Sequence, residues 1–490
     1  MKKKKLLIAF IGILSAICTY AQPLVWSQNI QATSIDLRTA VVKLGQIPIN
    51  APSAGTVVVR FDGFAVIDVG DRVLFAASDN GDWGVNEGHV SIEVPSSDVN
   101  RKSFSHTMTY NISAGADTFY AVAFNSSVEA DGNGIGSVYG HLTVEFFPSA
   151  GTAFAQCLPI TFSGNVEGAP VVVKQAITNF PSAGKAVVRF DGFCISDVGD
   201  RIVLAASDIA DWGVNDGNVT CEAYTTDENR NPFSHTRVYN VTAGADTFFA
   251  VAQNFVETDG NGSVSIYGHL TVEFFPDAGN AEVEYQVVSQ SANLRGAPVT
   301  LATINFNAPS AGKAVVTFDG YCVSSAGDRI ILAASNIADW GVNDGASSVE
   351  AFDSDINSNS FSHSRTYTVA AGSNTFYAVG ENYVETDGSG SASIYGNFTL
   401  KFFPDAASGI TESDNPANTF TVYPNPASET AFVVFENTGT YSVKLHDLAG
   451  REIIVPQQAN EKTVALDLSL IPDGVYLLRV GESVRKIVKQ

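Results

Sequence analysis

The chain repeats itself, and this self-similarity constrains its fold more than any other feature. The segment Pro-Ser-Ala-Gly begins at Pro52, Pro181 and Pro309, at spacings of 129 and then 128 residues. Residues 181–278 and 309–406 align without gaps and are identical at 65 of 98 positions. A unit of this length is the size of a whole domain rather than of one turn of a solenoid. We therefore expect three tandem repeats of one fold, at residues 22–152, 153–280 and 281–408.

Apolar and polar residues alternate at a period of two within each repeat. Such runs lie at residues 269–274 of the second repeat and 397–402 of the third, and clusters of Gly, Asp and Asn separate the runs. This pattern predicts short strands with one face in a core and the other face in water. About seven or eight strands in each repeat, without a helical stretch, indicate an all-β chain of jelly-roll-like β-sandwiches.

The order of motifs in the repeats resembles that of a known group of jelly rolls. In the second repeat, Pro181-Ser-Ala-Gly, Ala243-Gly and Tyr267-Gly-His-Leu follow one another around aromatic strands. This order is similar to that of complement globular heads and tumour necrosis factor-like domains. The resemblance implies a jelly roll for each repeat, although the collagen stalk of the complement relatives is absent.

The N-terminus is typical of an export signal. Lys2 to Lys5 form a positive region, residues 6–17 form a short apolar core, and small residues flank Tyr20. We expect a signal peptide at residues 1–21, with cleavage after Ala21, so that Gln22 becomes the first residue. Cys18 raises a lipoprotein alternative, which the large Ile17 before it disfavours.

The last 71 residues differ in kind from the repeats. A polar linker at 409–419 precedes a segment of short predicted strands at 420–490. This segment resembles the type A C-terminal sorting domain of type IX secretion. The residues that carry the resemblance are Tyr423, Pro424, Asn425, Pro426, Gly450, Arg451, Gly474 and Tyr476.

The resemblance implies a route for the protein. The type IX machinery is the implied partner, and the implied route is Sec export, passage through the outer membrane and removal of the sorting domain. The mature protein would then stay on the outer-membrane surface or be released. The alternative interpretation is a fourth adhesion-type β-sandwich that the mature protein keeps.

Charge argues against a nucleic-acid partner, and hydropathy argues against a transmembrane segment. The chain has 28 Lys and Arg against 51 Asp and Glu, a formal net charge of −23. An acidic chain without a basic face cannot neutralise phosphates, so we expect no nucleic-acid partner. Beyond the signal peptide no stretch is long and apolar enough for a transmembrane segment.

A loop with the sequence Asp-Trp-Gly-Val-Asn recurs in all three repeats and holds the candidate site residues. Its tryptophans suit stacking against sugar rings, its Asp and Glu oxygens suit Ca²⁺, and a third interpretation is a tryptophan plug over a turn. The candidate ligand-binding residues are Trp83, Trp212, Trp340, Asn86, Asn215 and Asn343. The candidate Ca²⁺ ligands are Asp82, Glu87, Asp211, Asp216, Asp339 and Asp344. Ca²⁺ is the one cofactor that the loop allows.

No arrangement of residues predicts catalysis. The recurring histidines have no recurring Ser or Cys nucleophile in a fixed relation to them, and repeated units are typical of binding modules. We therefore expect a secreted or cell-surface binding and adhesion protein for glycans or surface polymers, not an enzyme. The alternatives are a structural protein whose units pack as a pseudo-trimer and bind no small ligand, and a polysaccharide hydrolase. Whether Cys194 and Cys221 are bridged stays open.

Overall fold

A computed structural model of the protein describes residues 22–490 with several gaps. The gaps are residues 39, 84–87, 95–99, 128–133, 214–216, 224–228, 257–259, 342–344, 353–356, 385, 406–419, 436–441, 447–451, 461 and 481–482. The described residues form strands and turns, and none of them belongs to a helix that could cross a membrane. Two compact units divide the chain, Met1–Asp405 and Ala406–Gln490.

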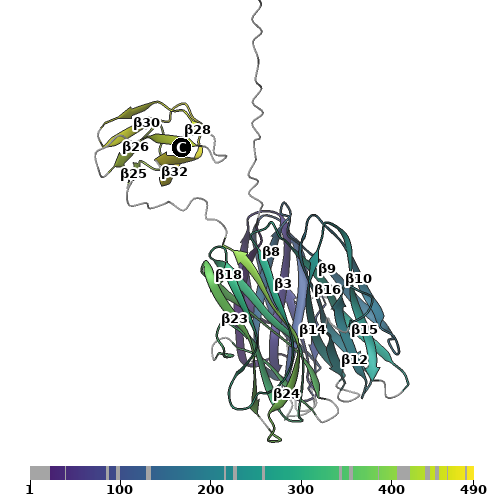
Figure 1. The fold of residues 1–490 in the computed structure, drawn as a ribbon. Helices are drawn as coiled ribbons and strands as arrows, with labels where there is room; N and C mark the ends of the chain where they lie inside the picture. The colour runs from purple at the N-terminus through teal and green to yellow at the C-terminus, as the bar shows by residue number, and fades with distance from the viewer. Residues whose placement is uncertain are drawn as a thin grey trace, which may run out of the picture. The chain divides into compact units, whose positions relative to one another are not determined.

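Each repeat contains eight strands. Figure 1 labels a number of them on the ribbon. The first repeat has β1 (Leu24–Asp36), β2 (Val42–Ala51), β3 (Gly55–Val66), β4 (Arg72–Ser78), β5 (Val90–Ile92), β6 (Arg101–Ile112), β7 (Gly115–Ser127) and β8 (Ile135–Pro148). The second has β9 (Phe154–Asn165), β10 (Val171–Phe180), β11 (Gly184–Ser196), β12 (Arg201–Ser207), β13 (Val219–Glu222), β14 (Arg230–Val241), β15 (Gly244–Val256) and β16 (Ser263–Pro276). The third has β17 (Glu282–Asn293), β18 (Val299–Ala308), β19 (Gly312–Ser324), β20 (Arg329–Ser335), β21 (Ser347–Glu350), β22 (Ser358–Val369), β23 (Gly372–Val384) and β24 (Ser391–Pro404).

The strands of each repeat form two antiparallel four-stranded sheets. In the first repeat the orders are β1-β8-β3-β6, here the inner sheet, and β2-β7-β4-β5, here the outer sheet. The second and third repeats have the same two orders in their own strands. Eight strands divided between two facing sheets in this way form a jelly-roll sandwich, so the predicted all-β fold class is confirmed.

The core of each repeat lies between its two sheets. On β3 the odd-numbered residues Val57, Val59 and Phe61 belong to the core of the first repeat and are fully buried. The matching residues of β11 and β19 lie in the cores of the second and third repeats. Every second side chain of β3, β11 and β19 therefore points into the core of its own repeat, as expected from the period of two in the sequence.

The polar face in the middle of each inner sheet is not in water, which corrects the expectation of a wet face. On β16 the polar residues His269, Thr271 and Glu273 are only 5%, 1% and 2% exposed. Arg60 and Asp62 on β3 are equally buried. These faces meet the inner strands of the neighbouring repeats, with contacts among β6, β14 and β22. A period of two assigns the residues of a strand to its two faces, but it does not indicate which part of the protein packs against the polar face.

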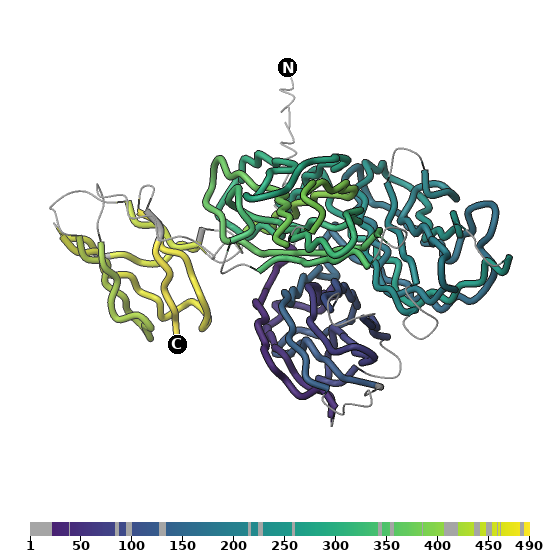
Figure 2. Tube along the Cα trace, turned by 90° about the horizontal axis from the view of Figure 1, so that it is seen from below, coloured from purple at the N-terminus to yellow at the C-terminus, as the bar shows by residue number. Residues whose placement is uncertain are grey.

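An apolar cluster joins the three repeats at one end of this interface. Phe147, Phe275 and Phe403 occupy equivalent positions, and their ring centroids lie 5.8 Å and 6.0 Å apart along the series. They are buried with valines from β3, β11 and β19 in one cluster that draws residues from all three repeats. Figure 2 shows the repeats as three adjoining bodies, coloured from purple-blue through teal to green.

The unit at Ala406–Gln490 is a separate small sandwich. One sheet has the order β25-β26-β30-β29 and the other β28-β27-β31-β32. The strands are β25 (Phe420–Tyr423), β26 (Thr430–Phe435), β27 (Val443–His446), β28 (Glu452–Ile453), β29 (Gln457–Ala459), β30 (Thr463–Asp467), β31 (Gly474–Val480) and β32 (Ser483–Lys489). They enclose an apolar core of their own, as predicted for this segment.

Candidate functional site

A ring of hydrogen bonds connects the three repeats at the centre of their interface. Asp191 Oδ2 accepts hydrogen bonds from Ser105 and Thr107 of the first repeat, at 3.1 Å and 2.6 Å. In the same way, Asp319 Oδ2 accepts from Ser234 and Thr236 of the second repeat, at 3.0 Å and 2.5 Å.

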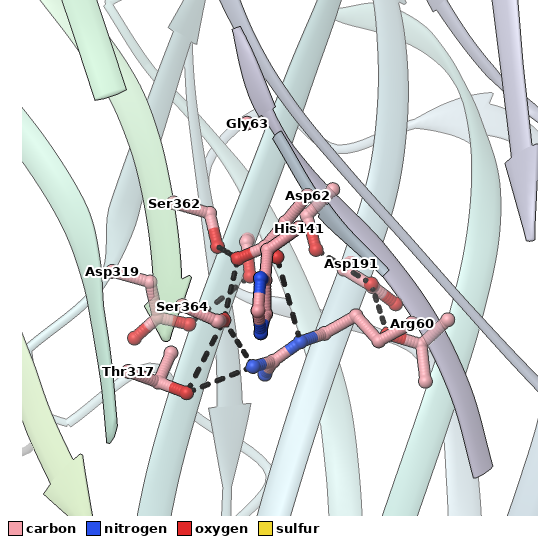
Figure 3. A network of polar contacts seen from close by, with 12 residues as sticks. Arg60, Asp62, Gly63, His141, Asp191, Thr317, Asp319, Ser362 and Ser364 are labelled. Carbon is pink, nitrogen blue, oxygen red and sulfur yellow. Dashed lines mark hydrogen bonds and ion pairs between the residues drawn. The ribbon is translucent and has the colours of Figure 1, made fainter. Parts of the chain in front are cut away.

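The ring closes from the third repeat to the first. Asp62 Oδ2 accepts from Ser362 and Ser364, at 3.3 Å and 2.5 Å (Figure 3). Arg60 reaches the same hydroxyl of Ser364 and also donates to Thr317 Oγ1 at 2.9 Å. Each repeat therefore supplies an aspartate to one neighbour and hydroxyl groups to the other.

A buried ion trio lies on the same interface. Lys401 Nζ is 2.6 Å from Glu145 Oε2 and 2.6 Å from Glu273 Oε2, and all three side chains are at most 4% exposed. The three residues occupy one equivalent position of the inner sheets, on β24, β8 and β16. The sequence carried the signal for this trio, because the third repeat has a lysine where the others have a glutamate.

This polar interface is closed rather than open to a ligand. The space where β6, β14 and β22 meet has no room for a water molecule. Burial raises the pKa of Asp191 to about 6, against the lowering effect of Arg189 and of the hydroxyl donors. We conclude that the buried charges hold the repeats together and that a binding site has to be sought elsewhere.

A cleft of about 490 Å³ lies at the junction of the first and second repeats. We call it the Trp83 cleft, because the tryptophan of the first Asp-Trp-Gly loop lines it. Its apolar and aromatic lining residues are Leu74, Trp83, His89, Ile160, Phe193, Ile195 and Tyr267. Its polar lining includes Arg72, Ser91, Ser126, Thr161, Arg230 and His269. The first repeat provides one wall and the second repeat provides the other.

Four rings form a row along this cleft. The centroid of Trp83 lies 5.2 Å from that of His89, and His89 stacks on Phe193 at 5.7 Å. Phe193 stacks in turn on Tyr267 at 5.2 Å. Burial, with a smaller effect of Arg230, lowers the pKa of His89 to about 4, so its ring is neutral at neutral pH.

The backbone explains why two of these rings stand side by side. Phe193 on β11 is paired directly with Tyr267 on β16. The preceding pair, Gly192 and Gly268, approaches so closely that a Cβ atom on Gly192 would lie 2.1 Å from the carbonyl oxygen of Tyr267. Two glycines at this crossing therefore let the strands pack tightly beneath the aromatic pair.

Two guanidinium groups reach the cleft and share one carboxylate. Arg72 forms an ion pair with Glu93 through Nε, and Arg230 Nη1 lies 3.2 Å from the same Glu93 Oε1. The arginine side chains are 34% and 23% exposed. Among the described residues at this position, two positive groups thus meet one negative group, which gives them a net positive charge within a strongly acidic chain.

The other two tryptophans are placed differently. Trp212 Nε1 donates to Gln253 Oε1 at 2.5 Å, and Trp340 Nε1 donates to Glu381 Oε2 at 2.5 Å. Both acceptors lie on the outer sheet of the same repeat, where the first repeat has Phe124. All three tryptophans are partly buried, between the exposed and the fully buried positions that the competing interpretations required.

The three repeats also differ in the residue that faces the tryptophan loop. His89 of the first repeat is replaced by Asn218 in the second and by Ala346 in the third. Ala346 lines a much smaller space of about 60 Å³ at the junction of the third and first repeats. The differences between the repeats, rather than their shared motif, thus create the Trp83 cleft.

The predicted Ca²⁺ ligands that the structure describes accept hydrogen bonds from backbone N–H groups of their own turns. Asp82 Oδ1 accepts from the Trp83 N–H at 2.8 Å, Asp211 Oδ1 from Gly213 at 3.4 Å, and Asp339 Oδ1 from Gly341 at 3.2 Å. Within the described ranges no group of three or more His, Cys, Asp or Glu side chains could hold a metal ion. The remaining predicted residues lie outside the described residues: Asn86, Glu87, Asn215, Asp216, Asn343 and Asp344.

The cysteines of the repeats are thiols. Cys157, Cys194, Cys221 and Cys322 are all free, so Cys194 and Cys221 are not bridged in this structure. Burial raises the pKa of Cys194 and of Cys322, and it raises that of Cys157 to about 12. Cys157, Cys194 and Cys322 are therefore un-ionised at neutral pH and are weak nucleophiles.

The sorting motif has a clear place in the small C-terminal sandwich. Asn425 Nδ2 donates to the Lys486 carbonyl at 2.8 Å, and its Oδ1 accepts from the Val488 N–H at 2.9 Å. The Tyr423-Pro-Asn-Pro turn is thereby tied to the last strand. Tyr476 is buried and donates to the Pro472 carbonyl at 2.6 Å, whereas Gly450 and Arg451 lie outside the described residues.

One buried histidine provides a test of the interface through pH. Burial lowers the pKa of His269 to about 4. An unfolded histidine titrates near 6.5, so the folded state loses stability as the pH falls from 6.5 towards 4. By pH 5 this residue should lower the free energy of unfolding by about 2 kcal/mol. The reason is that each pH unit below the unfolded-state pKa lowers it by about 1.4 kcal/mol.

His269→Asn, which copies Asn397 of the third repeat, should remove this part of the acid sensitivity. We expect the free energy of unfolding to fall less between pH 7 and pH 5 in the variant than in the natural protein. Urea unfolding at the two pH values measures the difference. Equal losses in the two proteins would show that the pKa of His269 is not lowered in the folded state.

Comparison with known proteins identifies the tail. Residues 421–490 match the model of the secretion system C-terminal sorting domain. The resemblance seen in the sequence is confirmed, and the tail marks the chain for export by type IX secretion to the cell surface or the extracellular space. Compared with curated proteins, the chain has no significant match.

Among solved structures the likenesses are weak. PNGase F from Flavobacterium meningosepticum, a glycosylasparaginase, is 10% identical with a TM-score of 0.23, over 53% of this chain and 97% of that chain. The Sulfolobus turreted icosahedral virus structure is 13% identical with a TM-score of 0.19, over 77% and 90%. Latent PorU from Porphyromonas gingivalis is 9% identical with a TM-score of 0.18, over 75% and 32%. At these TM-scores the likenesses carry no argument about function.

Proposed function

From a chain that ends in a type IX sorting domain, we propose a secreted binding protein whose ligands are carbohydrate chains of surface polymers. The Trp83 cleft is the proposed site. The observation that carries the proposal is the row of rings from Trp83 to Tyr267 beside two arginines in a cleft of about 490 Å³. Small-molecule sites have this size and combine aromatic walls with a few polar groups.

The chemistry of the cleft favours an acidic sugar. Flat apolar rings such as Trp83 and Tyr267 suit the C–H faces of pyranose rings. The guanidinium groups of Arg72 and Arg230 suit a carboxylate or sulfate, because their N–H donors match such groups in pairs. An acidic polymer would gain from this local positive charge, which a neutral polymer could not use.

A structural role remains the second candidate. The ring of aspartates and hydroxyls and the ion trio around Lys401 support it, because three repeats that interlock in this way form a pseudo-trimer. In this alternative the unit is an assembly component of the cell surface and binds no small ligand. The two candidates differ in whether the Trp83 cleft is occupied.

The route of the protein completes the proposal. The signal peptide at residues 1–21 directs Sec export, and the sorting domain is removed after the outer membrane is crossed. The mature protein then starts at Gln22 and retains the three repeats. It acts outside the cell, either attached to the surface or released.

Trp83→Ala should weaken binding of polygalacturonate at least about tenfold, because truncating an aromatic residue that anchors a ligand costs about 2 kcal/mol or more. Isothermal titration calorimetry with polygalacturonate and with neutral dextran measures this effect. Trp340→Ala is the matched control, since Trp340 bonds Glu381 on its own outer sheet. Equal binding by both variants, or no binding of either polymer by the natural protein, would refute the proposed site.

A further inference from the structure

Three equivalent positions at the interface hold an amine and two amides. Lys102 is the second residue of β6, Asn231 is the second residue of β14, and Asn359 is the second residue of β22. These strands contact one another across the repeats. The first repeat therefore presents a lysine to a position where the other two repeats carry asparagine.

Lys102 and Asn231 are in direct contact. Lys102 Nζ lies 2.7 Å from Asn231 Oδ1, and the two residues are 9% and 4% exposed. The carbonyl carbon Cγ of Asn231 is bonded to that oxygen, so the amine stands beside it. Asn231 Nδ2 is buried and has no hydrogen-bond partner among the described residues.

The surroundings favour an uncharged lysine. Burial lowers the pKa of Lys102 to about 7, against the raising effects of Cys221, Glu93 and Glu222. A large part of the amine is therefore neutral near neutral pH, and a neutral lysine amine is a nucleophile.

We propose that Lys102 and Asn231 react to form an isopeptide bond that links the first and second repeats. The bond from Lys102 Nζ to Asn231 Cγ forms, and the bond from Cγ to Nδ2 breaks. Of the two hydrogens on the neutral amine, one stays on the new amide and the other passes to the departing nitrogen. Amine and carboxamide thus give a secondary amide and one molecule of ammonia, with no oxidation or reduction and no cofactor.

Proximity makes this reaction accessible. Two groups held in contact react as one molecule rather than as two, which removes much of the entropic barrier. Lys102 and Asn231 are only 9% and 4% exposed, so little water reaches them to compete with the reaction. The resulting cross-link would close a loop of 129 residues and restrict the unfolded chain, as a disulfide does.

The test is the mass of the protein itself. The chain from Pro23 to Gln490, which has no N-terminal glutamine to cyclise, is purified and kept at pH 8 and should be lighter than its sequence by one ammonia molecule. Peptide mapping after denaturation should find a branched peptide that joins Lys102 to Asn231. The full sequence mass in the folded natural protein would overturn the proposal.

Variants separate this bond from other modifications. Lys102→Arg and Asn231→Ala should each restore the full mass expected for their sequences. Asn359→Ala is the matched control and should keep the loss of ammonia. Asn231→Asp should instead lose one water molecule and give the same branched peptide. A branched peptide that contains Asn359 would contradict the assignment to Asn231.

Discussion

Lys401→Met should destabilise the unit of three repeats by about 3–5 kcal/mol, the cost of removing one partner from a buried ion pair. Lys401 lies between Glu145 and Glu273, and the variant leaves both carboxylates buried without their common cation. Urea unfolding at pH 7.5 measures the change. The loss should shrink at pH 5, because a buried carboxyl without a cation has a raised pKa and is stabilised as it takes up a proton.

A triple variant separates the charges from the packing. Glu145→Leu, Glu273→Leu and Lys401→Met together remove every charge of the trio and should restore stability to within about 1–2 kcal/mol of the natural protein or above it. If the single Lys401→Met variant unfolds at the same urea concentration as the natural protein, the trio does not support the interface.

Deleting residues 420–490 should reduce the exported fraction to background in a host that has type IX secretion. The segment that this deletion removes is the one that matches the secretion system C-terminal sorting domain, and we expect export to depend on it. The truncated protein should accumulate in the periplasm, which cell fractionation and immunoblotting measure. Its repeats form a separate compact unit that ends at Asp405, so the deletion should not unfold them.

Two further variants serve as controls for this deletion. Residues 406–490 fused to a periplasmic reporter should carry the reporter to the surface or the medium. Asn425→Ala should reduce export of the full chain, because Asn425 ties the first turn of the sorting domain to its last strand. Export of the truncated chain at the full-length level would contradict the role of the tail.

Most of the fold of this chain can be predicted from its sequence. The repeat at Pro52, Pro181 and Pro309 indicates the number of units, and period-two runs predict strands. The run at 269–274 shows what the alternation does not predict, which is whether the polar face is exposed. His269, Thr271 and Glu273 alternate as a solvent-facing row would, yet they are buried against another repeat. Alternation along a strand indicates how polar each face is. The surface that covers the face is determined by contacts between residues far apart in the chain.

The candidate site was predictable only in part. The sequence indicates the tryptophan loop as a recurring feature, but the cleft depends on residues that the repeats do not share. Phe124 stands where Gln253 binds the indole of Trp212, and His89 stands where the third repeat has Ala346. Arg230 reaches Glu93 from 137 residues away in the sequence. No pattern within one repeat could have brought these groups together.

The ring of hydrogen bonds from Asp191 through Asp319 to Asp62 has a consequence for how this protein can evolve. In an open array, each duplication of a repeat adds a link to the end, and the length of the protein can drift. Here the third repeat returns to the first, so every inner face already has its neighbours. A single extra copy would have no partner for either of its two faces. Growth by duplication would therefore have to proceed in complete sets of three, which keeps the copy number constant while the individual repeats remain free to diverge.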